Sequence, residues 1–482
     1  MIISCYNTAT ENKTEALFGI KFMSSFRRNS IKIFISIILL FSCSAVVPAG
    51  YCIEEGSTVE TAEKQSEKLV GKINFEDVLA KAKNHSYDLK IADYNILIAK
   101  QNVRGARSEY FPKLNFGGGM EYTKNYRDIR ETTVMSIGEA FINPYTRFQS
   151  VLGINVMYNL FDFGVRGGNL KIAKKDVKIK ELENKQKYQD MSMTLLDTYT
   201  KILITTKQID INKEILNLEQ KTLELNERLY KAKEISKMEL NDSKVRVSNA
   251  KNRIYELKSI RNESINWLSF YTGEEYDSEN LKISDLKKSD FDVLKFQDYT
   301  KSIIWKIHEE NIKKKELELQ VAKRNNYPKL NAYGRYYWYG SNHSNYPKSL
   351  DIEPSNLSVG ASLSMPLFDG FKNSALIQKT ALELKQLQVE RDKAIAELAT
   401  KLAVMRSNLI YLDEQINENN TAIKELTNKE NSTHKLVSKK LASPIEENNA
   451  KVELLNQKIE LSKNSITQIA ITRGIQILTE EE

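Results

Sequence analysis

The sequence contains very little glycine and proline. Its 482 residues include 19 Gly and 8 Pro, whereas about 12% of the residues of an average protein are one or the other. Neither occurs between Asn169 and Thr272 or between Phe371 and Ser443, and both stretches are rich in Lys, Glu, Leu and Ile. Because glycine and proline interrupt regular structure, these stretches predict very long helices. They argue against a set of compact α/β domains and against an enzyme built on glycine-rich phosphate loops.

Cysteine and histidine are also scarce. The three cysteines, Cys5, Cys43 and Cys52, all precede residue 53, and the four histidines are isolated. The rest of the chain therefore offers no disulfide framework and no thiolate cluster for a metal. No HExxH, GxSxG or Walker motif is present. We therefore expect no enzyme activity, no catalytic residue, no metal site and no cofactor.

Long apolar runs and blocks of like charge are absent as well. No run reaches 18 apolar residues, which excludes a polytopic helical membrane protein. The 71 basic and 63 acidic residues are mixed along the chain. The net charge of +8 therefore indicates a solvated surface and no nucleic-acid partner.

The N-terminal segment has the order of a secretory signal. A basic stretch at 27–32 precedes the apolar run 33–41, and the small residues that follow end at Ala49, where we expect cleavage. The signal does not need residues 1–22, so Met23 is a candidate start. The residues before Cys43 also resemble a lipoprotein cleavage box, which leaves lipidation of Cys43 as an alternative.

A tandem repeat follows. Tyr-Phe-Pro-Lys-Leu-Asn at 110–115 recurs as Asn-Tyr-Pro-Lys-Leu-Asn at 326–331, and Leu-Phe-Asp at 160–162 recurs at 367–369. Each half runs in the same order: a helical segment, an aromatic residue with proline, a strand, a loop, a strand ending at Leu-Phe-Asp, and a long helical block. The repeat predicts two copies of one helix-strand-strand-helix unit.

The expected strands alternate apolar and small polar residues. In 357–365, Leu, Val, Ala, Leu and Met alternate with Ser and Gly. A period of two over about ten residues fits either a half-buried soluble sheet or a transmembrane barrel strand. The small uncharged polar faces favour a barrel lumen. The aromatic residues that we expect to face lipid are Tyr122, Tyr158, Tyr336 and Trp338.

The long helical blocks carry a heptad pattern. The heptad-spaced positions of the first block are Ile211, Ile215, Leu218, Thr222, Leu225 and Leu229, and those of the second are Leu398, Leu402, Met405, Leu409, Leu412 and Ile416. A sustained 3.5-residue repeat favours helices that supercoil against neighbours. A helix from 169 to 230 would be about 93 Å long, so shorter helices at 75–109 and 239–271 would line it end to end. The sequence predicts a mainly α fold with a short barrel on a hollow helical cylinder.

These motifs resemble those of the outer-membrane efflux protein family, the TolC-like outer-membrane factors. The resemblance spans about residues 72–475 and includes Phe-Glu-Asp-Val-Leu at 75–79 and Trp-Leu-Ser-Phe-Tyr-Thr-Gly at 267–273. It implies a homotrimer in the cell outer membrane, in which each protomer gives four strands to a twelve-stranded barrel and its helices to a coiled-coil tunnel through the periplasm. It also implies a passive exit duct of a tripartite efflux pump or type I secretion system. The implied partners are outer-membrane lipid, a periplasmic adaptor (membrane fusion) protein and an inner-membrane pump of the RND or ABC type.

The repeat sets the expected boundaries. We expect a signal peptide at 1–49, an N-terminal extension at 50–71, a first repeat at 72–273 with strands 113–123 and 150–162, an equatorial segment between the repeats at 274–295, a second repeat at 296–473 with strands 329–340 and 356–368, and a C-terminal tail at 474–482.

The resemblance also assigns sites. The barrel–tunnel junction would include Pro112, Pro328, Phe161, Asp162, Phe368 and Asp369. The adaptor would contact the tips of the helical hairpins at Arg228, Lys233, Ile235, Ser236, Lys440, Ser443 and Pro444. The family usually has glycine where Lys233 and Lys440 stand. The pore constriction would include Glu446 and Asn449, which share one helix face because they are three residues apart.

Two alternatives remain open. Glu446 could be an ordinary solvated charge near a helix start. The whole chain could be a secreted periplasmic coiled-coil adaptor or interaction protein, although an adaptor would not need two strand–loop–strand copies. The sequence does not identify the cargo.

Overall fold

The computed structural model describes residues 72–123, 135–137, 140–142, 148–288, 299–343 and 345–479. The expected signal peptide with Cys43 and the extension 50–71 lie outside these residues. The helices are α2 (Phe75–His85), α3 (Tyr87–Ser108), α4 (Val165–Lys231), α5 (Lys237–Thr272), α6 (Ile303–Arg324), α7 (Lys372–Ser438) and α8 (Pro444–Thr479), with 3-10 turns η1 (Tyr299–Lys301) and η2 (Pro347–Leu350). The strands are β1 (Lys72–Ile73), β2 (Lys113–Tyr122), β3 (Met135–Ile137), β4 (Ala140–Ile142), β5 (Phe148–Phe161), β6 (Lys282–Ile283), β7 (Lys329–Asn342) and β8 (Glu353–Ser364).

Two very long helices organise the helical part. α4 and α7 each have 67 residues, which is about 100 Å at 1.5 Å per residue. Each turns back into a helix of 36 residues, α5 or α8. Both ends of α7 lie 207 residues after those of α4, and both ends of α8 lie 207 residues after those of α5. The duplication of the sequence is therefore a duplication of structure.

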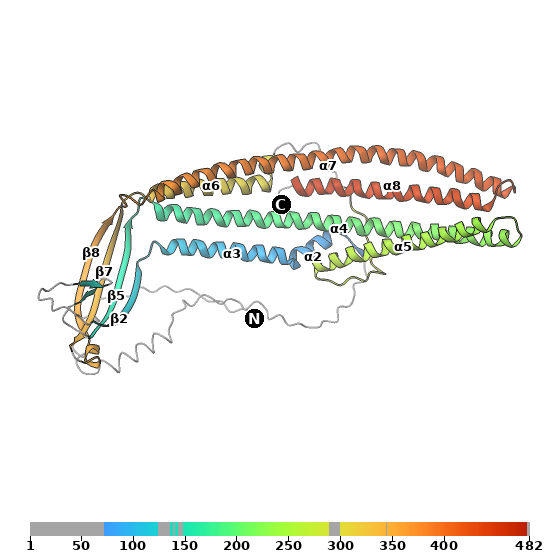
Figure 1. Cartoon of the computed structure of the whole chain (residues 1–482). Helices are drawn as coiled ribbons and strands as arrows, with labels where there is room; N and C mark the ends of the chain where they lie inside the picture. The colour runs from blue at the N-terminus through green and yellow to red at the C-terminus, as the bar shows by residue number, and fades with distance from the viewer. Residues whose placement is uncertain are drawn as a thin grey trace, which may run out of the picture. The chain divides into compact units, whose positions relative to one another are not determined.

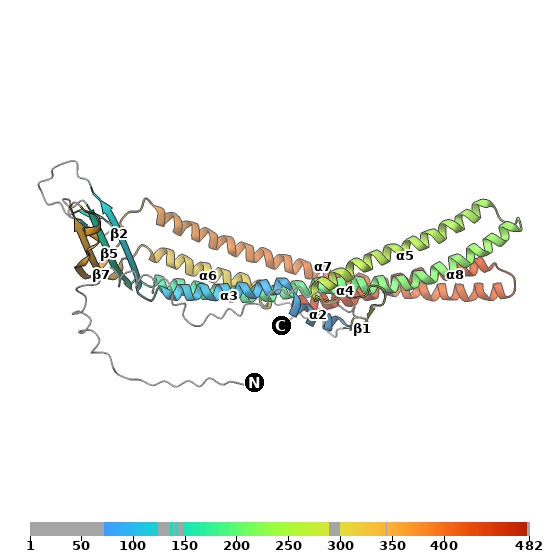
Figure 2. The ribbon, with the colours of Figure 1, turned by 90° about the horizontal axis from the view of Figure 1, so that it is seen from below.

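The two long helices differ in how many sides are covered. α3 and α5 pack along one side of α4, and α6 and α8 lie between α4 and α7 (Figures 1 and 2). α4 buries residues from Gly168 to Asn226, whereas the buried residues of α7 are Thr380, Leu398 and Leu402. One flank of α7 thus has no neighbouring helix among the described residues.

A four-stranded antiparallel sheet lies at one end of the helices (Figure 1). Its strand order is β2-β5-β7-β8, so the pairing of β5 with β7 joins the two repeats. β2 and β8 are the edges, and neither outer edge has a partner strand in the described part of the chain.

The main hydrophobic core lies near the middle of α4. Leu195, Tyr199 and Ile202 are buried there against α2 and α5. The Tyr199 hydroxyl is 2.7 Å from the Ser284 carbonyl and 3.0 Å from that of Ile73. It thereby ties the β1–β6 pair to α4, and this is where residues 274–288 of the expected equatorial segment pack. Residues 289–295 lie outside the described residues.

Several expected boundaries are wrong. The single helix expected over 75–109 is two helices, because the hydroxyl of Ser86 accepts the Leu89 N–H and caps α3. Serine at this position competes with a continuous helix by offering the backbone a local acceptor. The helix expected from residue 296 begins at Ile303, where Ser302 caps it in the same way.

The expected strand 356–368 is instead β8 at 353–364. Its partner β7 begins at Lys329, directly after Pro328, and the last pair of the ladder is Lys329 with Ser364. Pro366 also has no N–H to donate to a ladder. The other strands differ by one or two residues from those expected: 113–122, 148–161 and 329–342.

The expected tail at 474–482 is mostly helix. α8 continues to Thr479, and Ile475 is fully buried beside Leu398 and Leu402 of α7. The tail was misjudged because Ile475 has a packing partner on a helix that is distant in the sequence. None of the described helices has an apolar stretch that could cross a bilayer.

Candidate functional site

The sheet has one apolar and one polar face. Cross-strand partners share a face, and the register aligns Phe116 with Ile154, Ile154 with Tyr336, and Tyr336 with Leu357. The apolar face contains Leu114, Phe116, Met120, Tyr122, Leu152, Ile154, Val156, Tyr158, Tyr336, Trp338, Leu357, Val359 and Leu363. The four residues expected to face lipid therefore share this face.

The apolar face is largely uncovered in the single chain, except at one end, where η2 packs against Ser150 and Gly340. Phe116 is 63% exposed, Leu357 69% and Val359 80%. Tyr336 and Trp338 are half-buried because their rings pack edge to face with centroids 4.6 Å apart. A continuous exposed apolar surface of this kind marks a contact with lipid or with another protein.

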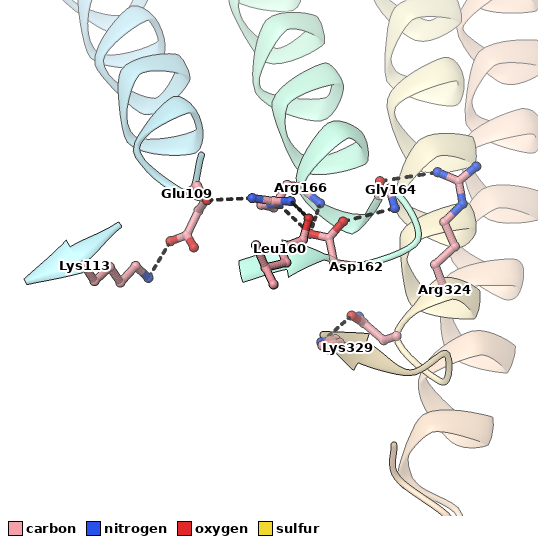
Figure 3. A network of polar contacts seen from close by, with 9 residues as sticks. Glu109, Lys113, Leu160, Asp162, Gly164, Arg166, Arg324 and Lys329 are labelled. Atoms are coloured by element: carbon pink, nitrogen blue, oxygen red, sulfur yellow. Dashed lines mark hydrogen bonds and ion pairs between the residues drawn. The ribbon is translucent and has the colours of Figure 1, made fainter. Parts of the chain in front are cut away.

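A buried ion pair holds the turn from β5 into α4. Asp162 is 5% exposed and accepts the N–H of Gly164 at 3.1 Å, the N–H of Arg166 at 3.0 Å and the Nε–H of Arg166 at 2.9 Å (Figure 3). The Arg166 guanidinium also donates to the carbonyls of Glu109 at 3.5 Å and Leu160 at 3.4 Å. One carboxylate and one guanidinium thus join α3, β5 and α4.

The matching turn of the second repeat, which leads from β8 into α7, forms only part of these contacts. Asp369 accepts the N–H of Asn373 at 2.9 Å, the bond that corresponds to the one between Asp162 and Arg166. Asn373 cannot supply a guanidinium. The sequence reasoning selected both aspartates but missed Arg166, although an Asp and an Arg four residues apart at a helix start is a recognisable ion-pair signal.

The other connections between the helices and the sheet contain proline or residues with positive φ. Pro112 lies between α3 and β2, and Pro328 lies between α6 and β7. Before α4 the chain uses two consecutive positive-φ residues, Phe163 and Gly164, and before α7 it uses Gly370 and Phe371. Phe161 packs on the Phe163 ring at 4.8 Å, and Phe368 packs on the Phe371 ring at 5.4 Å.

The two hairpin tips have the same backbone geometry. Lys233 and Lys440 have φ values of 64° and 58°. The N–H of Glu234 donates to the Leu229 carbonyl, and that of Leu441 donates to the Leu436 carbonyl, both at 2.9 Å. Together with the bonds from the lysine N–H groups, this is the Schellman motif, which glycine usually makes possible. Lysine adopts the glycine conformation here, and its charge suits a helix C-terminus.

The helices that leave the tips begin with the same Ser-x-x-Glu pattern but cap differently. Ser236 and Glu239 form a reciprocal capping box at α5. At α8 the Ser443 hydroxyl accepts the N–H of Ile445, while Pro444 takes the first helical position. The Glu446 carboxylate is exposed and makes no hydrogen bond or ion pair with any described residue. Asn449 is partly exposed on the same helix face.

The remaining expected tip residues lie at or beside these turns. Arg228 is in the last turn of α4, and its carbonyl accepts the Ala232 N–H. Ile235 directly precedes the cap residue Ser236 and is partly exposed.

A buried polar seam along α4 was not foreseen. Asn212, Glu219 and Asn226 recur every seven residues and are all buried. Asn226 hydrogen-bonds the Ser243 hydroxyl, and Glu219 pairs with Arg246 of α5 at 3.5 Å. The heptad positions chosen from the sequence are nearly all apolar, and the seven-residue spacing of these polar residues was a signal that the choice overlooked.

A charged cluster stands behind the α7/α8 tip. The Glu447 carboxylate lies 2.5 Å from Lys451 Nζ and 3.0 Å from His434 Nδ1. The hydrogen bond from Lys451 is the main reason that the pKa of Glu447 is lowered. In the described residues no three His, Cys, Asp or Glu side chains are arranged to hold a metal ion.

The model of the outer membrane efflux protein family matches residues 78–274 and 309–469, which is more than half of the chain. The chain belongs to the outer membrane efflux protein family. The resemblance seen in the sequence is thereby confirmed, as is a fold that combines a helical part with a barrel-forming sheet.

Solved structures agree with this family fold. The outer membrane protein VceC of Vibrio cholerae aligns with a TM-score of 0.70 at 14% identity, over 84% of this chain and 96% of that one. The CmeC outer membrane channel of Campylobacter jejuni gives 0.66 at 14% identity, over 85% and 87%. The open state of the Neisseria gonorrhoeae MtrE outer membrane channel gives 0.54 at 14% identity, over 84% and 91%. At this identity the likeness shows the fold. No curated protein sequence matches the chain directly.

Proposed function

We propose that three copies of this chain close into a channel in the outer membrane. The supporting observation is the sheet, which has an exposed apolar face, a polar face and two unpaired edges. Three copies of four strands make a twelve-stranded barrel with the apolar face toward lipid and the polar face toward the lumen. Closure removes both edges, as a membrane barrel requires.

The helical part supports the same closure. The order of helices is α3 with α5, then α4, then α6 with α8, then α7. The free flank of α7 exposes Leu382 and Val389, and α3 exposes Ile91 and Tyr94. In a ring, α7 of one copy meets α3 and α5 of the next, and these apolar side chains leave water. The same ring encloses a tunnel that continues from the barrel.

The channel is a passive exit duct of a tripartite efflux pump or type I secretion system. The two tips carry the exposed basic residues Lys233 and Lys440 in one repeated turn, which suits a periplasmic adaptor that delivers cargo from an inner-membrane pump. The family fold and the hairpins support this role, and transport through such a duct needs no catalytic residue.

Disulfide trapping tests the closure. In a Cys52→Ser background, Phe116→Cys on β2 is combined in turn with Leu357→Cys, Val359→Cys or Leu363→Cys on β8. We expect at least one pair to yield a covalent trimer in outer-membrane fractions. Replacing Phe116→Cys by Leu152→Cys, on a central strand, should abolish the product. A ladder that ends at two copies, or no product from any pair, contradicts the closure.

We also propose that Glu446 forms an acidic ring at the periplasmic constriction. Its carboxylate is not used as a cap, unlike that of Glu239 at the corresponding position, so three copies are available to face a threefold axis. Such rings attract cations. Glu446→Gln should weaken cation selectivity and block by divalent ions in single channels, whereas Glu239→Gln should leave both unchanged. Unchanged cation selectivity in Glu446→Gln refutes the ring.

A further inference from the structure

The polar face of the sheet has one charged side chain at its centre. The register places Arg335 of β7 in one row with Asn115, Asn155 and Ser358. The other charged residues of this face in the four strands lie toward strand ends, and they are Lys113, Lys329, Glu121 and Glu353. Lys113 is ion-paired with Glu109 at 3.0 Å. The central row is otherwise built of small, uncharged polar groups.

Tyr333 and Tyr337 flank Arg335 along β7, and their rings pack over the neighbouring strands β8 and β5. A Cβ added at Gly153 would collide with the ring of Tyr337, and one added at Gly360 would collide with the ring and hydroxyl of Tyr333. The absence of a side chain at each glycine therefore lets a tyrosine ring lie flat against the sheet. The Tyr337 hydroxyl lies 3.0 Å from Asn155 Oδ1, which fixes the position of that ring.

The guanidinium of Arg335 contacts one of these two rings. Arg335 Cζ lies 4.5 Å from the centroid of the Tyr333 ring, the distance of a cation–π contact. Arginine remains charged at every physiological pH and can bind carboxylate, sulfonate or phosphate groups through two parallel hydrogen bonds. Aromatic faces beside it offer a stacking surface to a ring in the same ligand.

We infer that Arg335 makes the barrel lumen a recognition point for anionic aromatic solutes. The inference rests on the proposed closure, which brings three copies of Arg335, each flanked by Tyr333 and Tyr337, into one ring. Cargo that carries an aromatic part and a carboxylate, sulfonate or phosphate group is then retained at this level on its way out. The barrel and the tip constriction thereby carry charges of opposite sign.

Channel block tests the inference directly. Purified protein is inserted into planar bilayers, and 8-hydroxypyrene-1,3,6-trisulfonate is added to the side of the extracellular loops. We expect the trisulfonate to block the wild-type channel and to bind Arg335→Gln with an affinity about tenfold lower. Arg335→Lys should bind it with an intermediate affinity, because lysine keeps the charge but loses the two-point contact. Block should weaken between about 0.1 M and 1 M salt, because the Debye length falls from about 10 Å to about 3 Å.

The controls separate this inference from the channel proposal. Lys348→Gln removes an exposed positive charge in η2, outside the rows of the sheet. Channels of this variant should be blocked by the trisulfonate as strongly as those of the wild type. If the wild type forms no conductance, the proposed channel fails and this inference fails with it. If channels form but Arg335→Gln is blocked as strongly as the wild type, the channel stands and the role of Arg335 is refuted. Equal block by an aromatic cation, pyrenyl-trimethylammonium, also refutes it.

Discussion

The duplicated junction allows the buried Asp162–Arg166 pair to be measured against an internal control. Asp162→Asn keeps one carbonyl oxygen, which can still accept a backbone N–H, but it removes the charge beside a guanidinium whose side chain is 14% exposed. Hydrogen bonds to charged groups contribute about 1.5–3 kcal/mol, and a buried charge that loses its partner costs more. We expect opening of the first turns of α4 to become easier by about 2–4 kcal/mol.

The corresponding change in the second repeat should matter much less. Asp369 accepts one backbone N–H, and the guanidinium is replaced by Asn373. Asp369→Asn should therefore cost about 0.5–1 kcal/mol, the size of a single capping interaction. The two substitutions are chemically identical and lie at matching places in the repeat, so general effects of losing a carboxylate cancel in the comparison.

Hydrogen exchange followed by mass spectrometry measures both sites in the assembled protein. A cost of about 2–4 kcal/mol corresponds to a rise in opening of roughly 30- to 900-fold in peptides at the start of α4, because about 1.4 kcal/mol is a factor of ten. Peptides at the start of α7 in Asp369→Asn should change by less than about tenfold by the same conversion. Equal changes at the two sites would show that the buried pair contributes nothing beyond an ordinary cap.

Three further expectations concern the sheet, the core and the tips. Gly153→Ala pushes a Cβ into the Tyr337 ring, at a cost of about 1–3 kcal/mol from overpacking, and should lower the temperature at which the proposed trimer dissociates in SDS. Gly117→Ala enters open space and should leave that temperature unchanged. Burial raises the pKa of the Tyr199 hydroxyl above its ordinary value of 10.0. As the pH rises above 10.0, the hydroxyl therefore loses its proton in the unfolded chain before it does so in the folded chain. Stability should then fall by about 1.4 kcal/mol per pH unit, and Tyr199→Phe should flatten this alkaline slope of the melting temperature; an unchanged slope would exclude Tyr199 as its source. Lys233→Gly and Lys440→Gly remove left-handed strain of about 1 kcal/mol each and should slow hydrogen exchange at the tips, while faster exchange would mean that the lysine side chains hold the turns.

Local sequence patterns were enough to predict the long helices and the four strands of the main sheet. The alternation in 357–365 and the heptads of the long blocks are short-range signals, because each residue type reports which face of its own helix or strand is buried. The repeat then predicted that the elements follow in the same order in both halves. The same reasoning missed the Ser86 cap and continued α2 into α3, because one capping hydrogen bond leaves apolar periodicity unchanged.

The roles of matching residues could not be deduced from matching sequence. Glu239 and Glu446 follow the same serine pattern, but only Glu239 closes a capping box. Asp162 and Asp369 end the same Leu-Phe-Asp motif, but only Asp162 meets an arginine. These differences depend on which neighbour a side chain reaches across space.

The sequence by itself determined a duplicated chain of long helices and alternating strands, because periodicity, breakers and repeats are properties of neighbouring residues. Only the tertiary structure decided that β5 pairs with β7, that α4 is enclosed while one flank of α7 is free, and that Arg335 lies between tyrosines resting on glycines. The pairing of Gly153 with Tyr337 joins residues 184 positions apart. Such contacts follow from register and close packing, which set distances between segments that no local pattern encodes.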